Sequence, residues 1–342
     1  MKNAHLFALI LNLLLALPAL SDDVSSDLEE LGDDFVVSTD GSVTVQQSNE
    51  GRGLGESYVS FSAAWKEKIK AVITAQLAQA IDAEQISFKQ GFDWRNFVSQ
   101  AYIEIREIND MPVAVIVGKQ PIQFGQNLEM MPFFQNAPVK ALQQLEQVFG
   151  LTIELTKGPL GFFDEIRASF YETQAEDMSI GKVNGKNLTL TKYLSERLLL
   201  TVGLTEEERT ENDETYRANI GIVGTNKSGK LIGWLEGIIF HNDPNFQNSF
   251  VAVTGGLSWE FLPTATVVTE FSMINNYVYQ LGLALKKDFP DLFYVGAEAR
   301  ISHLVQENTQ DVFIGISLGT NFNYSSQDDD VKENLVDLDT LE

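Results

Sequence analysis

The longest alternation of apolar and polar positions lies near the end of the chain. From Val312 to Tyr324 every second residue is apolar or threonine, and the residues between them are mostly small or polar. Successive side chains of a strand point to opposite faces, so the pattern predicts a strand with one apolar and one polar face. Its thirteen residues exceed the usual soluble strand and approach the length that a tilted strand needs to cross a bilayer.

Shorter alternating runs fill the chain upstream of this strand, and they predict an all-β protein. Fifteen runs are recognised: 58–65, 68–78, 97–107, 113–120, 151–157, 162–172, 187–194, 197–205, 216–222, 231–239, 251–260, 265–273, 277–286, 293–302 and 312–324. Bacterial transmembrane barrels have an even number of antiparallel strands, and Ser42–Gln47 supplies a sixteenth. We therefore expect a transmembrane antiparallel β-barrel of 16 strands. Fourteen is the alternative, because 58–78 and 187–194 are ambiguous.

The connectors between these runs alternate in length. Short connectors fall at 109–112, 158–161, 195–196, 225–230, 261–264 and 287–291, and longer ones mostly lie between them: 121–150, 173–186, 206–215, 241–249 and 303–311. Outer-membrane barrels have short periplasmic turns and longer external loops. The alternation therefore indicates that both ends of the barrel face the periplasm. A soluble β-sandwich, the competing fold, needs neither strands of this length nor an export signal.

The N-terminus has the layout of a secretory signal peptide. Lys2 precedes an apolar stretch from Leu6 to Leu17, and Ala19-Leu20-Ser21 is a small-x-small cleavage site. The sequence thus divides into a signal peptide (1–21), an acidic segment (22–41), a barrel (42–324) with a long loop at 121–150, and an acidic tail (325–342). This organisation predicts an outer-membrane protein of a Gram-negative bacterium.

Composition narrows the function classes. The formal net charge of −24 argues against nucleic-acid binding, and much of it lies in the two acidic flanks, which we interpret as solvating segments. The chain has no cysteine and only three histidines, with no metal-ligand spacing, so we expect no disulfide, metal, cofactor or enzymatic activity. Residues 224–230 resemble a phosphate loop, but Leu231 stands where Ser or Thr must hold Mg²⁺.

The polar faces of the predicted strands offer a lining for a pore. The candidates are seven acids and six bases: Glu104, Glu154, Glu165, Glu236, Glu260, Glu270 and Glu298, with Arg106, Arg167, Arg197, Arg217, Lys286 and Arg300. Opposite charges in near balance suit a water-filled channel that orients polar solutes. The same residues could instead pair as structural bridges in a plugged lumen.

The loop 121–150 is the longest predicted connector and is unusually apolar. Folded inward, it would narrow the pore with constriction candidates Glu129, Met130, Met131, Phe133 and Phe134. The alternative is packing at a subunit interface or as a cap, and the sequence leaves both open.

Two resemblances follow from these residues. The ending Ser317-x-Gly319-x-x-Phe322-x-Tyr324 resembles the C-terminal β-signal read by the barrel-assembly machinery. The segment Ala101–Arg106, a short turn and then Val115–Gly125 resembles a block of phosphate-selective-type porins, and more closely the LbtU-type siderophore porins. The likeness is sharp over 97–135, and eighteen residues follow Tyr324 where the family usually ends. It implies a sixteen-stranded porin, often a homotrimer, in contact with outer-membrane lipid and lipopolysaccharide.

The sequence therefore predicts a porin that passes small hydrophilic solutes by passive diffusion. Two alternatives stay open: a substrate-specific uptake porin of the siderophore type, and a closed barrel with a structural or surface-interaction role.

Overall fold

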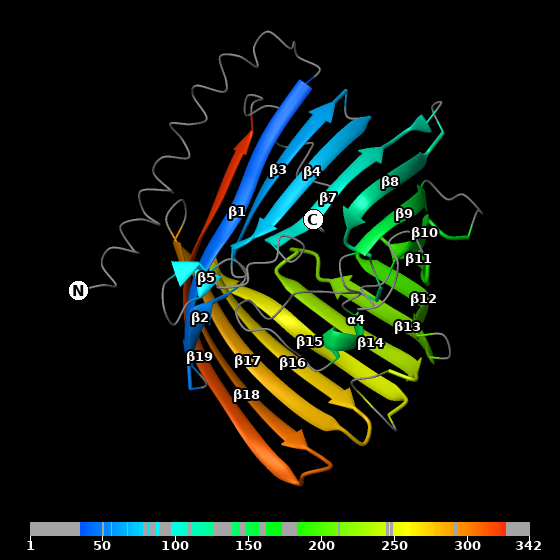
Figure 1. The fold of residues 1–342 in the computed structure, drawn as a ribbon. Coiled ribbons are helices and arrows are strands. Elements are labelled where there is room, and N and C mark those ends of the chain that lie inside the picture. The colour runs from blue at the N-terminus through cyan, green and yellow to red at the C-terminus, as the bar shows by residue number, and fades with distance from the viewer. Residues whose placement is uncertain are drawn as a thin grey trace.

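The chain forms a closed antiparallel β-barrel of sixteen strands (Figure 1). The computed structural model describes residues 35–49, 51–55, 57–66, 68–77, 81–82, 87–88, 97–108, 111–122, 124–125, 139–143, 148–156, 162–172, 183–210, 213–243, 246, 249–289 and 293–325. Within these ranges, no helix is long and apolar enough to cross a membrane.

Each barrel strand pairs with its neighbours in chain order. The first eight are β1 (Phe35–Ser48), β3 (Tyr58–Trp65), β4 (Ile69–Gln76), β7 (Val98–Ile105), β8 (Val113–Gln120), β9 (Val148–Leu155), β10 (Glu165–Tyr171) and β11 (Gly185–Ser195). The other eight are β12 (Leu198–Thr210), β13 (Asp213–Thr225), β14 (Leu231–His241), β15 (Val251–Leu262), β16 (Ala265–Ile274), β17 (Val278–Phe289), β18 (Phe293–Leu304) and β19 (Thr309–Ser325).

Three short strands lie outside this ring. The strand β2 (Arg52–Leu54) folds back on β1, while β5 (Ile81–Asp82) and β6 (Ser87–Phe88) form a separate two-stranded sheet. A single short helix, α4 (Lys140–Gln143), is described between β8 and β9. The expected sixteen-stranded barrel is thus confirmed.

The ring closes where its first and last strands meet. β1 pairs with β19 in antiparallel register from Ser38↔Ser325 to Ser48↔Gly315, and it pairs with β3 on its other side. Closure removes the exposed sheet edges that would otherwise invite aggregation. Closure also places the start of β1 and the end of β19 at the same rim as the turn between β3 and β4. Phe35 at the start of β1 pairs with Trp65 at the end of β3, and Ser325 at the end of β19 pairs with Ser38.

The strands run further than the alternation predicted. β1 begins at Phe35 rather than at Ser42, so it takes in part of the segment interpreted as an acidic flank. β12 and β13 continue to Thr210 and from Asp213, which shortens the loop expected at 206–215. Near a rim an outward side chain is no longer required to be apolar, so alternation weakens before the strand ends.

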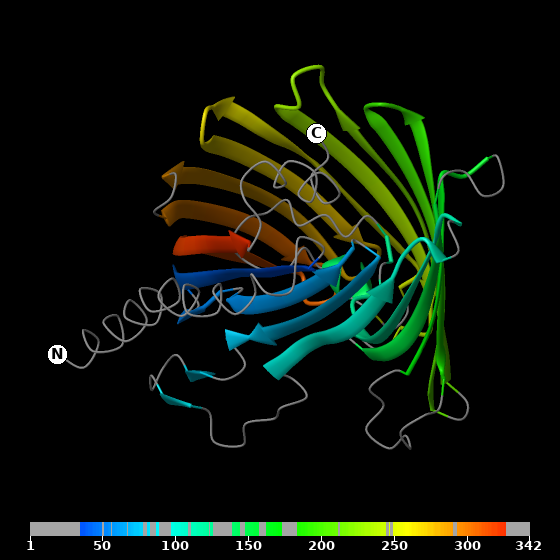
Figure 2. The same ribbon diagram turned by 90° about the horizontal axis from the view of Figure 1, so that it is seen from above.

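The faces of the barrel are reversed relative to a soluble protein. On β19 the side chains of Ile314 and Ile316 are 58% exposed on the exterior, whereas Ser317 between the outward positions is 4% exposed on the interior. The same alternation continues around β14, β17 and β18. Figure 2 shows the same ring of strands turned by 90°.

Exposed aromatic side chains gather at both ends of this apolar exterior. The end with short connectors carries Trp65, Trp259, Phe261, Phe289 and Phe293, and the end with long connectors carries Phe149, Phe170, Tyr216, Phe250, Phe271 and Tyr279. Aliphatic residues such as Leu235, Leu283 and Ile316 lie between the two groups. Two aromatic girdles around an aliphatic belt are the surface pattern of transmembrane barrels.

Candidate channel lumen

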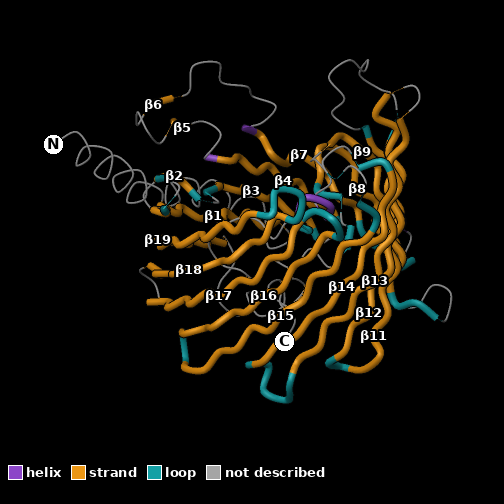
Figure 3. Tube along the Cα trace, turned by 90° about the horizontal axis from the view of Figure 1, so that it is seen from below, coloured by secondary structure: helices purple, strands orange, loops and turns teal. Residues whose placement is uncertain are grey.

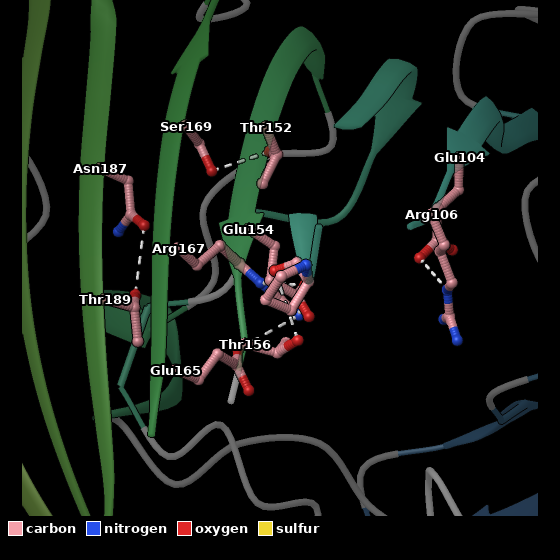
Figure 4. Close-up of polar contacts among 11 residues, drawn as sticks. Glu104, Arg106, Thr152, Glu154, Thr156, Glu165, Arg167, Ser169, Asn187 and Thr189 are labelled. Carbon is pink, nitrogen blue, oxygen red and sulfur yellow. Dashed lines mark hydrogen bonds and ion pairs between the residues drawn. The ribbon is translucent and has the colours of Figure 1, made fainter. Parts of the chain in front are cut away.

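The inward face of β9 to β11 is lined by hydroxyl and amide side chains that bond to one another, both across strands and along one strand (Figure 4). The Thr152 and Ser169 hydroxyls lie 2.8 Å apart on β9 and β10, and the Thr189 hydroxyl donates to Asn187 Oδ1 at 3.2 Å. Each of these four residues is buried, because the neighbouring inward side chains cover it. Alternation along the strands therefore gives this wall a polar inner surface.

Charged pairs lie beside this polar surface, toward the rim with short connectors. Arg167 on β10 reaches Glu154 on β9 at 2.6 Å, and Glu165 lies 3.5 Å from the same guanidinium. Arg106, which follows β7, contacts Glu104 at 2.5 Å. Figure 4 draws both groups, and the alternation along β7, β9 and β10 places them on the inward face. The predicted lining residues of this wall are therefore brought together as ion pairs.

Further charge pairs lie on β13, β17 and β18, at several heights of the wall. Arg217 on β13 lies 2.9 Å from Asp243 and 3.6 Å from Glu207, near the rim with long connectors. Arg300 pairs with Glu298 on β18, and the Lys286 ammonium lies 2.9 Å from Asp288 on β17. These contacts agree with the charge pairing that the sequence left open as an alternative.

The remaining lining candidates occupy different environments. Glu236 on β14 is 1% exposed and accepts hydrogen bonds from Asn219 Nδ2 at 2.7 Å and from Gln143 Nε2. Glu270 is buried on the inward face of β16, and Glu260 faces inward near the end of β15. Arg197 lies in the exposed turn between β11 and β12, not on the strand wall.

The connector between β8 and β9 packs inside the barrel. Its residues Ile122, Phe124, Val139 and Leu142 are buried in one apolar cluster. The wall residues of that cluster come from β10, β14, β15, β16 and β17: Tyr171, Ile238, Phe240, Ala252, Ile274 and Val278, with Phe246 from a connector. Figures 1 and 3 draw α4 within the outline of the barrel. This packing of the described residues agrees with inward folding, while narrowing of a pore by this loop stays a prediction.

The named constriction candidates cannot be placed. Glu129, Met130, Met131, Phe133 and Phe134 lie outside the described residues, so their role stays a prediction. The described ends of the same connector nevertheless occupy part of the lumen, against Glu236 and the wall around it.

The residues of the terminal signal lie at the seam of the barrel. Ser317 and Gly319 face inward on β19, and the hydroxyl of Tyr294 lies beside Gly319. Phe322 packs its ring over Gly41 of β1, and Tyr324 pairs with Thr39 through the backbone. Their part in assembly stays a prediction, but the geometry gives Phe322 a structural partner.

Alternation over the full strands adds charges that the sequence analysis missed. Asp40, Lys70, Glu207, Asp288 and Asp311 all hold inward positions of their strands. Each had been assigned to a flank or a connector, or passed over between apolar residues. Continuing the period of two past the last apolar residue of each run would have found them.

No group of His, Cys, Asp and Glu in the described part of the chain could hold a metal ion. His241 is exposed at the end of β14, and His303 lies on β18 near the long-connector rim.

Comparison with known proteins bears on the fold. No protein-family model and no curated protein sequence matches this chain. Among solved structures, the outer membrane channel DcaP of Acinetobacter baumannii aligns with a TM-score of 0.59 at 10% identity, covering 84% of this chain and 96% of that one.

Two further structures align over the whole of their own chains. A loop L8 deletion mutant of OmpT, an outer membrane protein of Vibrio cholerae, has a TM-score of 0.58 at 10% identity and covers 85% of this chain. An anion-selective porin from Comamonas acidovorans has a TM-score of 0.55 at 14% identity over the same share. At these identities the likeness establishes the barrel fold alone.

Proposed function

We propose that this protein is an outer-membrane porin whose water-filled channel passes small hydrophilic solutes by passive diffusion. One observation carries the proposal: a closed barrel has an aliphatic exterior between two aromatic girdles and an interior lined by charges and hydroxyls. In water, an apolar belt of this extent would be an aggregation hazard, whereas lipid covers it without cost. The similarity of the fold to outer membrane channels adds support.

The apolar exterior and the arrangement of the connectors support a location in the outer membrane, with the ends of the barrel in the periplasm. Both ends of the barrel and the short turns share one rim, which we assign to the periplasm, and the long connectors face outward. A signal peptide over 1–21 would deliver the chain, and the barrel-assembly machinery would insert it among outer-membrane lipid and lipopolysaccharide. Protease accessibility of tags at 306 and at 326 on intact cells tests this orientation. Cleavage at 326 but not at 306 would reverse it.

Conductance tests the channel directly. Purified protein added to planar bilayers is expected to give stepwise increases of current, and proteoliposomes are expected to swell in small sugars. Insertion of a folded protein without any step, at any voltage or salt, would exclude a porin.

The apolar cluster within the barrel favours one competing function. It joins the β8–β9 connector to β10 and to β14–β17, and with the ion pairs it could plug the lumen of a structural barrel. Release of dyes of increasing size from proteoliposomes separates the two: an open channel releases small dyes, and a plugged barrel retains all of them.

Substrate specificity and assembly are narrower proposals. A siderophore-type uptake porin would bind its ligand and lose conductance at low ligand concentration, whereas a general porin would not. The proposed homotrimer is tested by mass measurement in detergent, where a monomer mass would reject it.

A further inference from the structure

We propose that the channel prefers cations to anions. Acids outnumber bases on the described part of the lumen wall. The inference rests on the proposed channel function and names the class of solute that the channel favours.

The strand wall supplies the first part of the argument. The inward acids are Asp40, Glu104, Glu154, Glu165, Glu207, Glu236, Glu260, Glu270, Asp288, Glu298 and Asp311. The inward bases, with Arg106 just past β7, are Lys70, Arg106, Arg167, Arg217, Lys286 and Arg300. Eleven acids against six bases leave the described wall with a surplus of five negative charges.

Each of those bases already faces a carboxylate. Arg106, Arg167 and Arg217 have acid oxygens within 2.9 Å. Arg300 pairs with Glu298 and Lys286 with Asp288, while Lys70 interacts electrostatically with Asp40. A permeating anion therefore approaches a base whose charge a neighbouring acid offsets, and each base is a weak anion site.

The surplus of acids on the wall acts directly on ions in the channel. A channel with low-dielectric walls focuses the field of its wall charges, which raises the local concentration of the opposite ion. Acidic rings and walls select cations in this way. The acidic wall therefore keeps cations favoured along the path.

A salt gradient across a planar bilayer measures the preference. The full-length protein separates two KCl solutions of unequal concentration, and the zero-current potential gives the permeability ratio of K⁺ to Cl⁻. We expect K⁺ to be several times more permeant. A ratio of one or below overturns the inference while leaving a conducting channel, whereas the absence of conductance rejects the proposed function itself.

Two double variants test whether the acids of the inner wall cause the preference for cations. Glu154→Gln with Glu165→Gln neutralises two acids on the inner wall of β9 and β10. The matched control, Asp164→Asn with Glu206→Gln, neutralises one acid in the turn before β10 and one on the exterior of β12. The lumen variant should lower the K⁺ to Cl⁻ ratio toward one without reaching it, because three of the five surplus charges remain, and the control should leave the ratio unchanged. Equal ratios in the two variants overturn the inference.

A rim variant keeps the test decisive if the wall variant does not insert. Glu307→Gln with Asp311→Asn changes two exposed positions beside the turn between β18 and β19. It should also lower the ratio, because Asp311 is one of the inward acids of the wall and Glu307 lies in the turn before β19. Heat-modifiable mobility on gels verifies that each variant forms the barrel, and an unchanged ratio in the folded rim variant contradicts the inference.

Discussion

Gly125 occupies a position where a side chain has no room. Its φ is +73°, and a Cβ at this point would overlap Glu236 Oε1 on the barrel wall. Glu236 also accepts hydrogen bonds from Gln143 and Asn219, so the connector and the wall meet at this carboxylate. Gly125 thus allows the connector to approach the wall closely enough to be held there.

We expect Gly125→Ala to loosen the connector. A left-handed backbone costs a non-glycine residue about 1–2 kcal/mol, and the overlap with Glu236 adds to this. Single-channel conductance should rise or become noisier as the connector leaves the lumen. The matched control is Gly229→Ala, where φ is +70° but a Cβ meets nothing within 4 Å. Equal conductance in both variants would contradict the role given to Gly125.

Asp164 ties the turn before β10 to β11. It accepts the backbone N–H of Tyr193 at 2.7 Å and pairs with Lys192 at 3.2 Å. The hydrogen bond from Tyr193 and then the Lys192 charge lower the pKa of this carboxyl below 3.8. A lowered pKa in the folded state means that the stabilisation is present above 3.8 and disappears as pH falls through the folded value.

The Asp164→Asn variant should therefore melt at a lower temperature than the parent at neutral pH. The difference should shrink as pH falls below 3.8, because the parent carboxyl then becomes neutral as well. Melting curves of both proteins in detergent, recorded across that range, test the expectation. If the difference in melting temperature stays constant down to the lowest pH, the stabilisation by Asp164 does not come from its charge.

We expect assembly to depend on the contact between the first strand, β1, and the last strand, β19. The ring of Phe322 on β19 lies over Gly41 of β1, and β19 pairs with β1 as far as Ser325. We expect truncation after Ser325 to leave assembly intact, because the ladder between β1 and β19 is then complete. Loss of insertion in this truncated chain would place the assembly signal within the tail.

Phe322→Ala combined with Tyr324→Ala should impair insertion. The change removes the Phe322 contact with β1 and both aromatic residues that resemble a β-signal. The yield of heat-modifiable barrel in outer-membrane fractions measures the effect. Asn321→Ala with Asn323→Ala, on the inward face of the same stretch, is the matched control and should insert normally.

Strand centres were predictable, and strand ends were not. Runs such as 113–120 coincide with β8, because an apolar exterior forces alternation where the strand faces the aliphatic belt. The constraint fades toward the rims, so Phe35–Gly41 and Glu206–Thr210 were read as flank or loop.

The same limit explains the incomplete list of lumen charges. Glu104, Glu154 and Arg167 lie between apolar outward residues and were found, whereas Asp40 and Glu207 lie beyond them. No sequence signal showed that the β8–β9 connector would cross to β14–β17, since that contact depends on the shape of the closed barrel.

The barrel acts on ions through the sum of its charges, which gives the preference a salt dependence. The Debye length is about 10 Å at 0.1 M salt and about 3 Å at 1 M, so screening weakens the wall field at high salt. The K⁺ to Cl⁻ ratio should therefore fall as both KCl concentrations are raised at a fixed gradient. A ratio independent of salt would point instead to a narrow binding site.

Closure by β1 and β19 has a consequence for how the protein is made. The Thr44 hydroxyl meets the Tyr294 hydroxyl across 250 residues of sequence, and Asn49 bonds Ile314 across 265. During synthesis, the first strand emerges long before its partner exists, and its backbone groups stay open to wrong pairing meanwhile. A chain that ends before β19 therefore lacks the strand that closes the ring, and a sheet formed from it would have two bare edges instead of forming a smaller pore.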